Sequence, residues 1–419
     1  MSDLSPTEVV EIEICRRPIF VVGSQRSGTT ILASSLRHHG ALWYSTEGYI
    51  LNEIFGPERL DETYAVARLN LNRWLAREGV TREEFLERMG LGFNVLLSSR
   101  SGGKRWIEKT PENSLMIEVL GTMFPGACFI HILRDGRGAV NSMVNKRTAP
   151  GWVTDITWAC RAWRRYVDAA LEYAASHPDR CLTVRYEELV ADPEEGFEAI
   201  YQFIGVPYDR APMDFFRTHR TSSSFRRRIR SRSSHEALAD LWDVWPLQFK
   251  RIFLEDAGVA MLRYGMVSEE EMQQMVEDAR DPSDESPSWT EELEGYRSRR
   301  DLAAVVERGV PRDAVMLVVS KGDERLLELG DREAWHFPRD EDGGHPGYHP
   351  ADSEEAIARL EWLRARGAEY LVFPEGSLWW LEHYTGFRDH LAARYPRVVD
   401  ELDKCMIYGL QSVRQVPTA

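Results

Sequence analysis

The sequence has few cysteines, no long apolar run and no excess of positive charge. Its five cysteines include no CxxC pair, which argues against a disulfide framework and a zinc site and favours reduced, buried thiols in a cytoplasmic protein. No apolar segment approaches the roughly 18 residues that span a bilayer, and residues 1–17 mix acidic and basic side chains where a secretory signal is apolar. We therefore expect no membrane partner.

The charge balance limits the partners further. The formal net charge of the 419 residues is −15, whereas a general nucleic-acid binder presents a strongly basic face. We therefore expect no nucleic-acid partner, and an anionic ligand must be met by a local basic cluster. Residues 217–232 form one such cluster, with seven arginines and no acidic residue.

Strands alternate with helices in the first part of the chain. Each of three short apolar runs is followed by a turn and then by a helical pattern, which predicts a parallel sheet covered on both faces. Ligands of such sheets bind beyond the carboxyl ends of the strands. The predicted strands are residues 17–23, 127–133 and 180–186, and the predicted helices are residues 27–39, 139–146 and 187–205.

The chain is long enough for two domains. Residues 269–294 are acidic and carry Ser and Pro, a composition typical of a linker. Beyond them, residues 314–320 and 369–374 indicate buried strands, and residues 353–366 and 377–395 indicate helices. We predict an α/β protein with a P-loop-like parallel sheet and a second, smaller α/β domain at the C-terminus. The predicted parts are a ligand-binding domain at 15–270, an acidic linker or helix at 271–300 and an accessory domain at 301–419.

The segment Gly23-Ser24-Gln25-Arg26-Ser27-Gly28-Thr29-Thr30 places a glycine turn and hydroxyl side chains at the start of a helix. Unpaired backbone N–H groups and the helix dipole favour an anion there, and Arg26 can bind phosphate or sulfate oxygens. The pattern differs from a Walker A loop, because Thr29 stands where that loop has its lysine. This argues against an ATP-dependent phosphotransferase. A turn without any ligand remains an alternative for this segment alone.

Two motifs resemble those of the sulfotransferases that use 3′-phosphoadenosine 5′-phosphosulfate (PAPS). GSQRSGTTIL is similar to their 5′-phosphosulfate loop, and FIHILRDGRGAVNSM is similar to their 3′-phosphate motif. The motifs are in the family's order, and each follows a predicted strand. The resemblance covers residues 18–264 and is closer to the tyrosylprotein and carbohydrate sulfotransferases. It implies PAPS as the donor, no metal, and binding of the donor by Arg26, Ser27, Gly28, Thr29, Thr30, Arg134 and Ser142.

The same resemblance implies further residues. Lys109 in WIEKTPEN matches a lysine near the bridging oxygen of the donor, and Glu47 matches a catalytic base. Lys146 and Tyr186 match residues near the nucleotide. The arginine cluster lies where related enzymes have a segment that closes over the nucleotide, and we expect Arg226 and Arg228 to contribute.

The chemistry explains these residue types. Attack on sulfur develops negative charge on the departing oxygen, so the cations of Lys109 and Arg26 are expected to stabilise it. A base assists the acceptor hydroxyl by roughly 10²- to 10⁴-fold. Glu47 is the candidate base, although a solvated carboxylate is the alternative. His38 and His39 could compete for the role, but packing or surface positions are more usual for such residues.

Three functions thus stay open. The first is a sulfotransferase acting on the hydroxyl of a sugar or secondary metabolite, the second an ATP-dependent phosphotransferase, and the third a non-catalytic nucleotide-binding module. His336, His345 and His349 lie in a Pro- and Gly-rich segment of the C-terminal domain. Histidines so grouped can bind a metal, but a long ordered loop is the more usual reason for such a composition. The oligomeric state cannot be read from the sequence.

Overall fold

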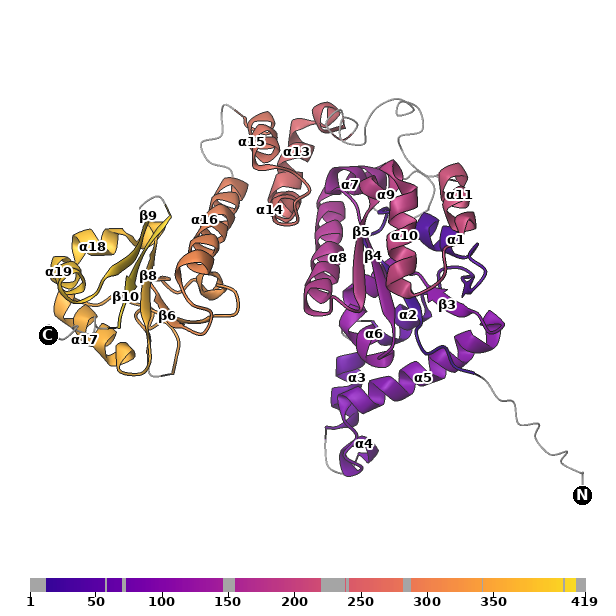
Figure 1. Cartoon of the computed structure of the whole chain (residues 1–419), viewed down its shortest axis with the longest axis horizontal. Coiled ribbons are helices and arrows are strands. Elements are labelled where there is room, and N and C mark those ends of the chain that lie inside the picture. The colour runs from indigo at the N-terminus through magenta and orange to yellow at the C-terminus, as the bar shows by residue number, and fades with distance from the viewer. Residues whose placement is uncertain are drawn as a thin grey trace, which may run out of the picture. The chain divides into compact units, whose positions relative to one another are not determined.

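A computed structural model of the protein (Figure 1) describes residues 13–56, 59–69, 73–145, 155–219, 238, 241–281, 288–340, 342–401 and 404–411. The chain divides into two compact units, residues 1–284 and 285–419. Each unit has its own sheet and its own apolar core. The predicted second, smaller α/β domain is thus confirmed.

The acidic segment predicted as a linker or helix contains helical residues on both sides of the division between the units. Helix α15 (Glu269–Asp278) belongs to the first unit and α16 (Ser288–Gly309) to the second. Ser268 and Glu271 cap α15 reciprocally. Acidic side chains in a first turn are favoured by the helix dipole, so part of the acidity of this segment, including Glu269, Glu270 and Glu271, stabilises a helix start.

The sheet of the first unit is entirely parallel, with strand order β2-β3-β1-β4-β5. The central strand β1 has the sequence IFVV and is completely buried, as expected for a strand covered on both faces. This confirms the predicted P-loop-like parallel sheet. The strands are β1 (Ile19–Val22), β2 (Leu42–Trp43), β3 (Arg105–Glu108), β4 (Cys128–Leu133) and β5 (Cys181–Arg185).

Helices cover both faces of this sheet (Figure 1). Side chains of α1, α9, α10 and α11 form the core on one face, and side chains of α2, α5, η1, α6 and α8 form the core on the other. The helices on the first face are α1 (Thr29–Leu36), α9 (Tyr186–Ala191), α10 (Pro193–Ile204) and α11 (Arg210–His219). Those on the second are α2 (Ile50–Phe55), α5 (Arg82–Ser101), η1 (Pro111–Met116), α6 (Ile117–Met123) and α8 (Ile156–Ser176).

Short helices complete the first unit. Helix α7 follows β4 directly and carries the second predicted motif. Trp163 of α8 anchors the turn between them, because its indole N–H donates to the Arg134 carbonyl at 3.1 Å. These helices are α3 (Arg59–Ala67), α4 (Trp74–Arg77), α7 (Gly136–Val144), α13 (Leu247–Phe253), η2 (Leu254–Gly258) and α14 (Val259–Arg263).

The second unit has a mixed sheet with strand order β7-β6-β8-β10-β9. Strands β7, β6 and β8 are parallel, whereas β10 pairs antiparallel with β8 and β9. Helices α17, α18 and α19 pack on one face, and α16 and η3 pack on the other. The elements are β6 (Val315–Val318), η3 (Glu324–Leu327), β7 (Glu333–His336), α17 (Ser353–Arg364), β8 (Tyr370–Pro374), η4 (Glu375–Ser377), α18 (Trp379–His383), α19 (Thr385–Arg394), β9 (Arg397–Glu401) and β10 (Cys405–Gly409).

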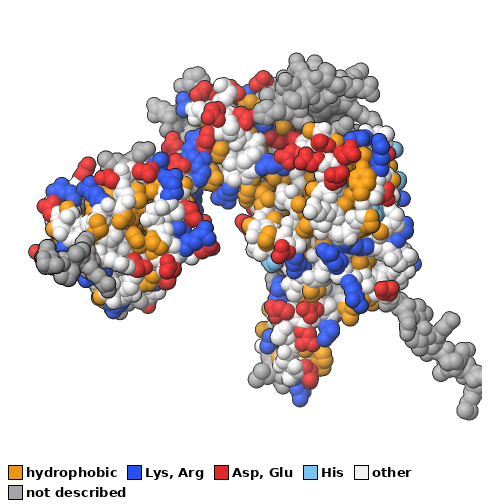
Figure 2. All heavy atoms as spheres, in the orientation of Figure 1, with side chains coloured by type: hydrophobic (Ala, Val, Ile, Leu, Met, Phe, Trp, Pro, Cys, Tyr) orange, Lys and Arg blue, Asp and Glu red, His pale blue; other side chains and the backbone are white. Residues whose placement is uncertain are grey.

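Charges of both signs are distributed over the surface. On the face shown in Figure 2, Lys and Arg side chains are interspersed with Asp and Glu. Within the described part of the chain, no helix combines the length and apolarity that a membrane crossing requires. Cys128, Cys160 and Cys181 are buried thiols outside any disulfide.

Candidate active site

The turn after β1 has the backbone conformation that a tight anion-binding loop requires. Gly23 and Gly28 have positive φ angles of 144° and 104°. A Cβ atom at Gly28 would lie 2.7 Å from the ring of Tyr186, so both the angle and the space require glycine there. Arg26 also has a positive φ angle, 66°, which is uncommon for a residue with a side chain. The turn thus holds the start of α1 against Tyr186 in a strained conformation of the kind found at functional sites.

The two sequence motifs meet in space. The Arg26 Nε atom donates to the Ser142 hydroxyl at 3.0 Å. The guanidinium of Arg134 donates to the Arg26 carbonyl at 2.7 Å and lies 4.8 Å from the centre of the Tyr186 ring. Residues predicted from separate strand-turn-helix units therefore form one cluster at the carboxyl ends of β1, β4 and β5.

The donor groups of this cluster suit an anion. Burial, together with the nearby charge of Arg134, lowers the pKa of Arg26 below its ordinary value. Two adjacent guanidinium groups repel each other, and a bound anion would relieve that repulsion. Ser27 is completely buried and its hydroxyl has no hydrogen-bond partner. A phosphate or sulfate group at this turn would supply the missing partner.

Lys109, directly after β3, is the most buried charge near the turn, with no exposed surface. Its ammonium donates to the Thr30 hydroxyl at 2.8 Å and to the Glu47 carboxylate. The other oxygen of Glu47 accepts from the Tyr49 hydroxyl. The structure thus brings two of the three predicted catalytic residues, Lys109 and Glu47, next to Thr30 at the end of the turn after β1.

The two charges of this pair have different exposure. The Glu47 side chain is 26% exposed, whereas Lys109 is fully enclosed. Burial raises the pKa of Glu47, but the hydrogen bonds from Lys109 and Tyr49 and the charge of Lys109 outweigh it, so the pKa lies below its ordinary value. Burial lowers the pKa of Lys109, and Glu47 offsets part of this effect. Glu47 is therefore ionised at neutral pH, as a base must be.

Sequence reasoning missed Glu108, the residue before Lys109. Its buried carboxylate accepts from the Thr110 hydroxyl at 2.7 Å and from the Asn113 amide. Burial raises its pKa to about 7 despite these bonds. The Thr110 hydroxyl also accepts from the N–H of Tyr49 at 3.3 Å, and Tyr49 has a left-handed φ angle of 53°. Glu108 thus holds Thr110, which positions the turn that carries Glu47.

Sequence reasoning also missed a pair of residues in the second motif. Asp135 accepts from the Arg137 N–H at 2.8 Å, which caps α7, and pairs with the Arg137 guanidinium at 2.8 Å. Both side chains are buried. The carboxylate of Glu187 accepts from the Asp135 N–H at 3.3 Å. These contacts fix the turn after β4, and the letters DGR in the sequence are their only local signal.

The other predicted residues lie as follows. Thr29 is buried in the first turn of α1, and Ser142 is buried on α7. His38 stacks on Phe215, and His39 bonds to the Pro207 carbonyl, so both serve packing rather than the cluster. Lys146, Arg226 and Arg228 lie outside the described residues. Among the described residues, no group of His, Cys, Asp and Glu side chains is arranged to hold a metal ion. His336, His345 and His349 therefore do not form a metal site in this structure.

Comparison with known proteins identifies the fold around this cluster. Residues 18–210 match the model of the sulfotransferase family. This segment is thus similar to that family, in agreement with the resemblance of the two motifs. Over 197 residues it is 26% identical to protein-tyrosine sulfotransferase 1 of Danio rerio, covering 46% of this chain and 54% of the relative. Over 195 residues it is 27% identical to protein-tyrosine sulfotransferase A of Caenorhabditis elegans, covering 46% and 50%.

The segment that matches the family model ends well before the second unit begins. The chain spans about half the length of these curated relatives. Among solved structures, the sulfotransferase domain from the Synechococcus PCC 7002 olefin synthase is 22% identical in sequence, with a TM-score of 0.37. The match covers 56% of this chain and 90% of the chain in that structure.

Proposed function

We propose that the protein transfers a sulfuryl group from PAPS to an acceptor hydroxyl. The observation that carries this proposal is the contact between the two motifs, in which Arg26 bonds to Ser142 and Arg134 bonds to the Arg26 carbonyl. A donor with phosphates at both its 5′ and 3′ positions needs two such sites within one nucleotide's length. The sulfotransferase family match adds independent support.

The residues divide into two binding groups. The N–H groups of Gly28, Thr29 and Thr30 would hold the 5′-phosphosulfate, because the first N–H groups of a helix have no partner within it. The Ser27 hydroxyl, which has no hydrogen-bond partner, would add a further donor. Arg134 and Ser142 would hold the 3′-phosphate, and the ring of Tyr186 lies against both the turn and Arg134. Bound PAPS would supply an activated sulfuryl group and a leaving phosphate.

Lys109 and Glu47 divide the chemistry. The Lys109 ammonium is buried beside Thr30, where a fixed cation stabilises negative charge on a departing oxygen. Glu47 is partly exposed, ionised and positioned by Tyr49, so it can accept the proton of an incoming hydroxyl. Donor binding would draw Lys109 and Thr30 towards the phosphosulfate and leave Glu47 to the acceptor.

The proposal also names the class of acceptor. A sugar or secondary-metabolite hydroxyl is our first candidate, and the names of the curated relatives add the tyrosyl hydroxyl of a protein as the second. A cytoplasmic location, which buried thiols favour, is also part of the proposal. A screen of sugars, phenols and acidic tyrosyl peptides with ³⁵S-labelled PAPS distinguishes the acceptors.

Donor specificity is tested by calorimetry with 3′-phosphoadenosine 5′-phosphate against ATP. We expect the former to bind at least tenfold more tightly without Mg²⁺. Arg134→Ala should weaken the binding of 3′-phosphoadenosine 5′-phosphate by roughly 10²-fold, because a buried charged hydrogen bond is lost. The same variant should weaken the binding of adenosine 5′-phosphate only slightly. Equal losses for both nucleotides would contradict the assignment, and Mg²⁺-dependent ATP binding would favour a phosphotransferase.

A further inference from the structure

The carboxyl edge of the sheet in the second unit has the topology of a ligand site. Strand β6 lies between β7 and β8, and all three are parallel. The connection from β6 to β7 passes through η3 on one face, and the connection from β7 to β8 passes through α17 on the other. Ligands of open α/β sheets bind beyond the carboxyl ends of strands where the connections diverge in this way.

Hydrogen bonds join the three loops that leave these strands. The Ser377 hydroxyl donates to the Val319 carbonyl at 2.7 Å, and Lys321 Nζ donates to the Gly376 carbonyl at 2.5 Å. The loop after β7 is held by Tyr384, whose hydroxyl donates to the Pro350 carbonyl at 2.7 Å. The loops therefore form one fixed arrangement rather than three independent turns.

Two histidines lie at the centre of this arrangement, with ring centres 5.9 Å apart. The His336 ring is held by the Ser320 hydroxyl, 2.6 Å from its Nδ1 atom, and the serine oxygen accepts from the Gly322 N–H at 3.3 Å. The His345 Nδ1 atom accepts from the Gly347 N–H at 3.0 Å. Burial lowers the pKa of both imidazoles, so they are neutral at pH 7.

The proton of His345 must then reside on Nε2, because Nδ1 is an acceptor. This Nε2 atom is buried and has no hydrogen-bond partner. An unsatisfied buried donor costs roughly 1–3 kcal/mol, so such a group is retained where it meets an acceptor at another stage. A bound oxygen atom is the simplest acceptor.

Lys321 supplies a cation, and it lies between Ser320 and Gly322, the two residues that contact the histidines. The His345 ring covers Gly322, where a Cβ atom would be 3.5 Å from Nδ1. Lys321, the preceding residue, has a left-handed φ angle of 53° and places its ammonium 5.7 Å from the centre of the Trp379 ring. An ammonium has three donors, and the Gly376 carbonyl uses one. Asp340 acts electrostatically on both histidines, and its carboxylate accepts from the Gly344 N–H at 2.8 Å.

We propose that the strand-end cluster of Ser320, Lys321, Gly322, His336, His345 and Trp379 binds the oxyanion group of a small molecule. His345 Nε2–H and the ammonium of Lys321 donate to the anion, and the Ser320 hydroxyl keeps the His336 ring in place. The half-exposed indole of Trp379 is available to the uncharged part of the ligand. Phosphate, sulfate and carboxylate share this chemistry.

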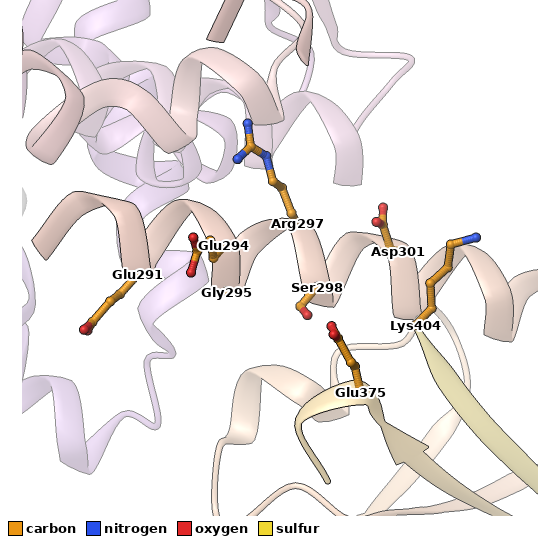
Figure 3. A pocket seen from close by; sticks show the side chains of 8 residues that line it. All are labelled: Glu291, Glu294, Gly295, Arg297, Ser298, Asp301, Glu375 and Lys404. Carbon is orange, nitrogen blue, oxygen red and sulfur yellow. The ribbon is translucent and has the colours of Figure 1, made fainter. Parts of the chain in front are cut away.

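A neighbouring hollow provides a contrast. It has a volume of about 560 Å³ and lies between α16 and the residue that follows β8, Glu375 (Figure 3). In Figure 3, the Glu375 side chain points towards Ser298, whereas the Arg297 side chain points away from Glu375. Four carboxylates and two cations line the hollow, a balance that disfavours an oxyanion: Glu291, Glu294, Asp301 and Glu375 against Arg297 and Lys404.

The experiment uses the full chain with ¹³Cε1-labelled histidine, titrated at pH 7.5 with inorganic phosphate, sulfate and acetate. We expect at least one anion to shift the NMR signals of His345 and His336 saturably, with a Kd of roughly millimolar size. The preferred anion identifies the ligand group. Because the signal comes from the second unit, donor binding by the sulfotransferase domain does not interfere with it.

Variants test the assigned donors. His345→Leu and Lys321→Met should each weaken anion binding roughly tenfold, because each variant loses a charged or buried hydrogen bond. In His345→Leu, binding is measured from the NMR signal of His336. Glu294→Gln in the hollow should leave the Kd within twofold. Absence of a saturable shift with all three anions, or an unchanged Kd in Lys321→Met, would overturn the proposal. Lys321 is exposed, so its substitution tests the site even if His345→Leu does not fold.

Discussion

Each unit places a basic residue in a left-handed conformation shortly after a parallel strand. In the first unit Arg26 and Gly28 follow the central strand β1, and in the second Lys321 and Gly322 follow β6. After the turn, the first unit continues into the eight-residue helix α1, whereas the second continues into the four-residue 3₁₀ helix η3. A full helix start can hold an anion with backbone N–H groups, but a short turn needs side chains for the same task.

This difference separates a reactive edge from a binding edge. In the first unit a buried lysine and a partly exposed carboxylate stand beside the turn. In the second unit the groups beside the turn are neutral histidines and a serine. These groups suit the binding of an anion, but they do not include the cation and carboxylate expected at a site of sulfuryl transfer. The following predictions test that contrast.

Lys109 is expected to carry the largest effect. Lys109→Ala should lower kcat by roughly 10³-fold, because a preorganised cation at the departing oxygen is lost. The measurement is ³⁵S transfer to the acceptor found in the screen. The exposed Lys104→Ala serves as the control and should retain full activity. Similar rates for Lys109→Ala and the wild type would mean that the Lys109 ammonium does not stabilise the departing oxygen.

Gly28 is expected to have the next largest effect. Gly28→Ala forces a side chain into a φ angle of 104° and against Tyr186, which together cost about 4 kcal/mol of unfolding free energy. Gly322→Ala, with a φ angle of 86° and its nearest neighbour at 3.5 Å, should cost about 2 kcal/mol. Denaturant unfolding measures both.

Gly92→Ala is the matched control, because this helical glycine has no neighbour within 4 Å of an added Cβ atom and no positive φ angle. It should be neutral or stabilising. If Gly28→Ala proves as mild as Gly92→Ala, the strained conformation of the first turn is not required.

Glu108 is expected to have a smaller effect that depends on pH. Its folded-state pKa of about 7 exceeds the ordinary 4.5, so its contribution to stability is complete below pH 4.5 and lost as the pH rises through 7. A shift of this size corresponds to at most roughly 3 kcal/mol. Glu108→Gln should therefore lose less stability than the wild type between pH 5 and pH 8, measured by chemical denaturation.

The amide of Asn113 can rotate to accept from the new Gln, since its own oxygen has no partner at present. The exposed Glu172→Gln is the control and should follow the wild type at both pH values. An unchanged pH dependence in Glu108→Gln would mean that this carboxyl is ionised in the folded protein.

The first motif was readable from the sequence because its chemistry is contiguous. A phosphate loop is made of consecutive residues, so Gly23 to Thr30 predicted both the turn and the anion. The resemblance to known sulfotransferases added Arg134 and Ser142, and the structure brings both next to Arg26. Strands covered on both faces are continuous apolar runs, which is why β1, β4 and β5 were predicted within a few residues.

Other features depend on residues far apart in the chain. Tyr49 and Thr110 are 61 residues apart, and no local pattern links them to Glu108. Strand β2 has two residues, too few for any periodicity. In sequence, the antiparallel strands β9 and β10 come after alternating strands and helices, a pattern that predicts parallel strands. Their antiparallel direction is seen only from the pairing of β10 with β8 and β9 in the structure. The acidity of residues 269–294 was interpreted mainly as a linker because helix caps and linkers share the same residue types.

A crystal structure with bound 3′-phosphoadenosine 5′-phosphate tests the central claim most directly. We expect the 5′-phosphate on the N–H groups at the start of α1 and the 3′-phosphate between Arg134 and Ser142. Nucleotide bound at any other place in the first unit, or with only one of its phosphates on these residues, would contradict it.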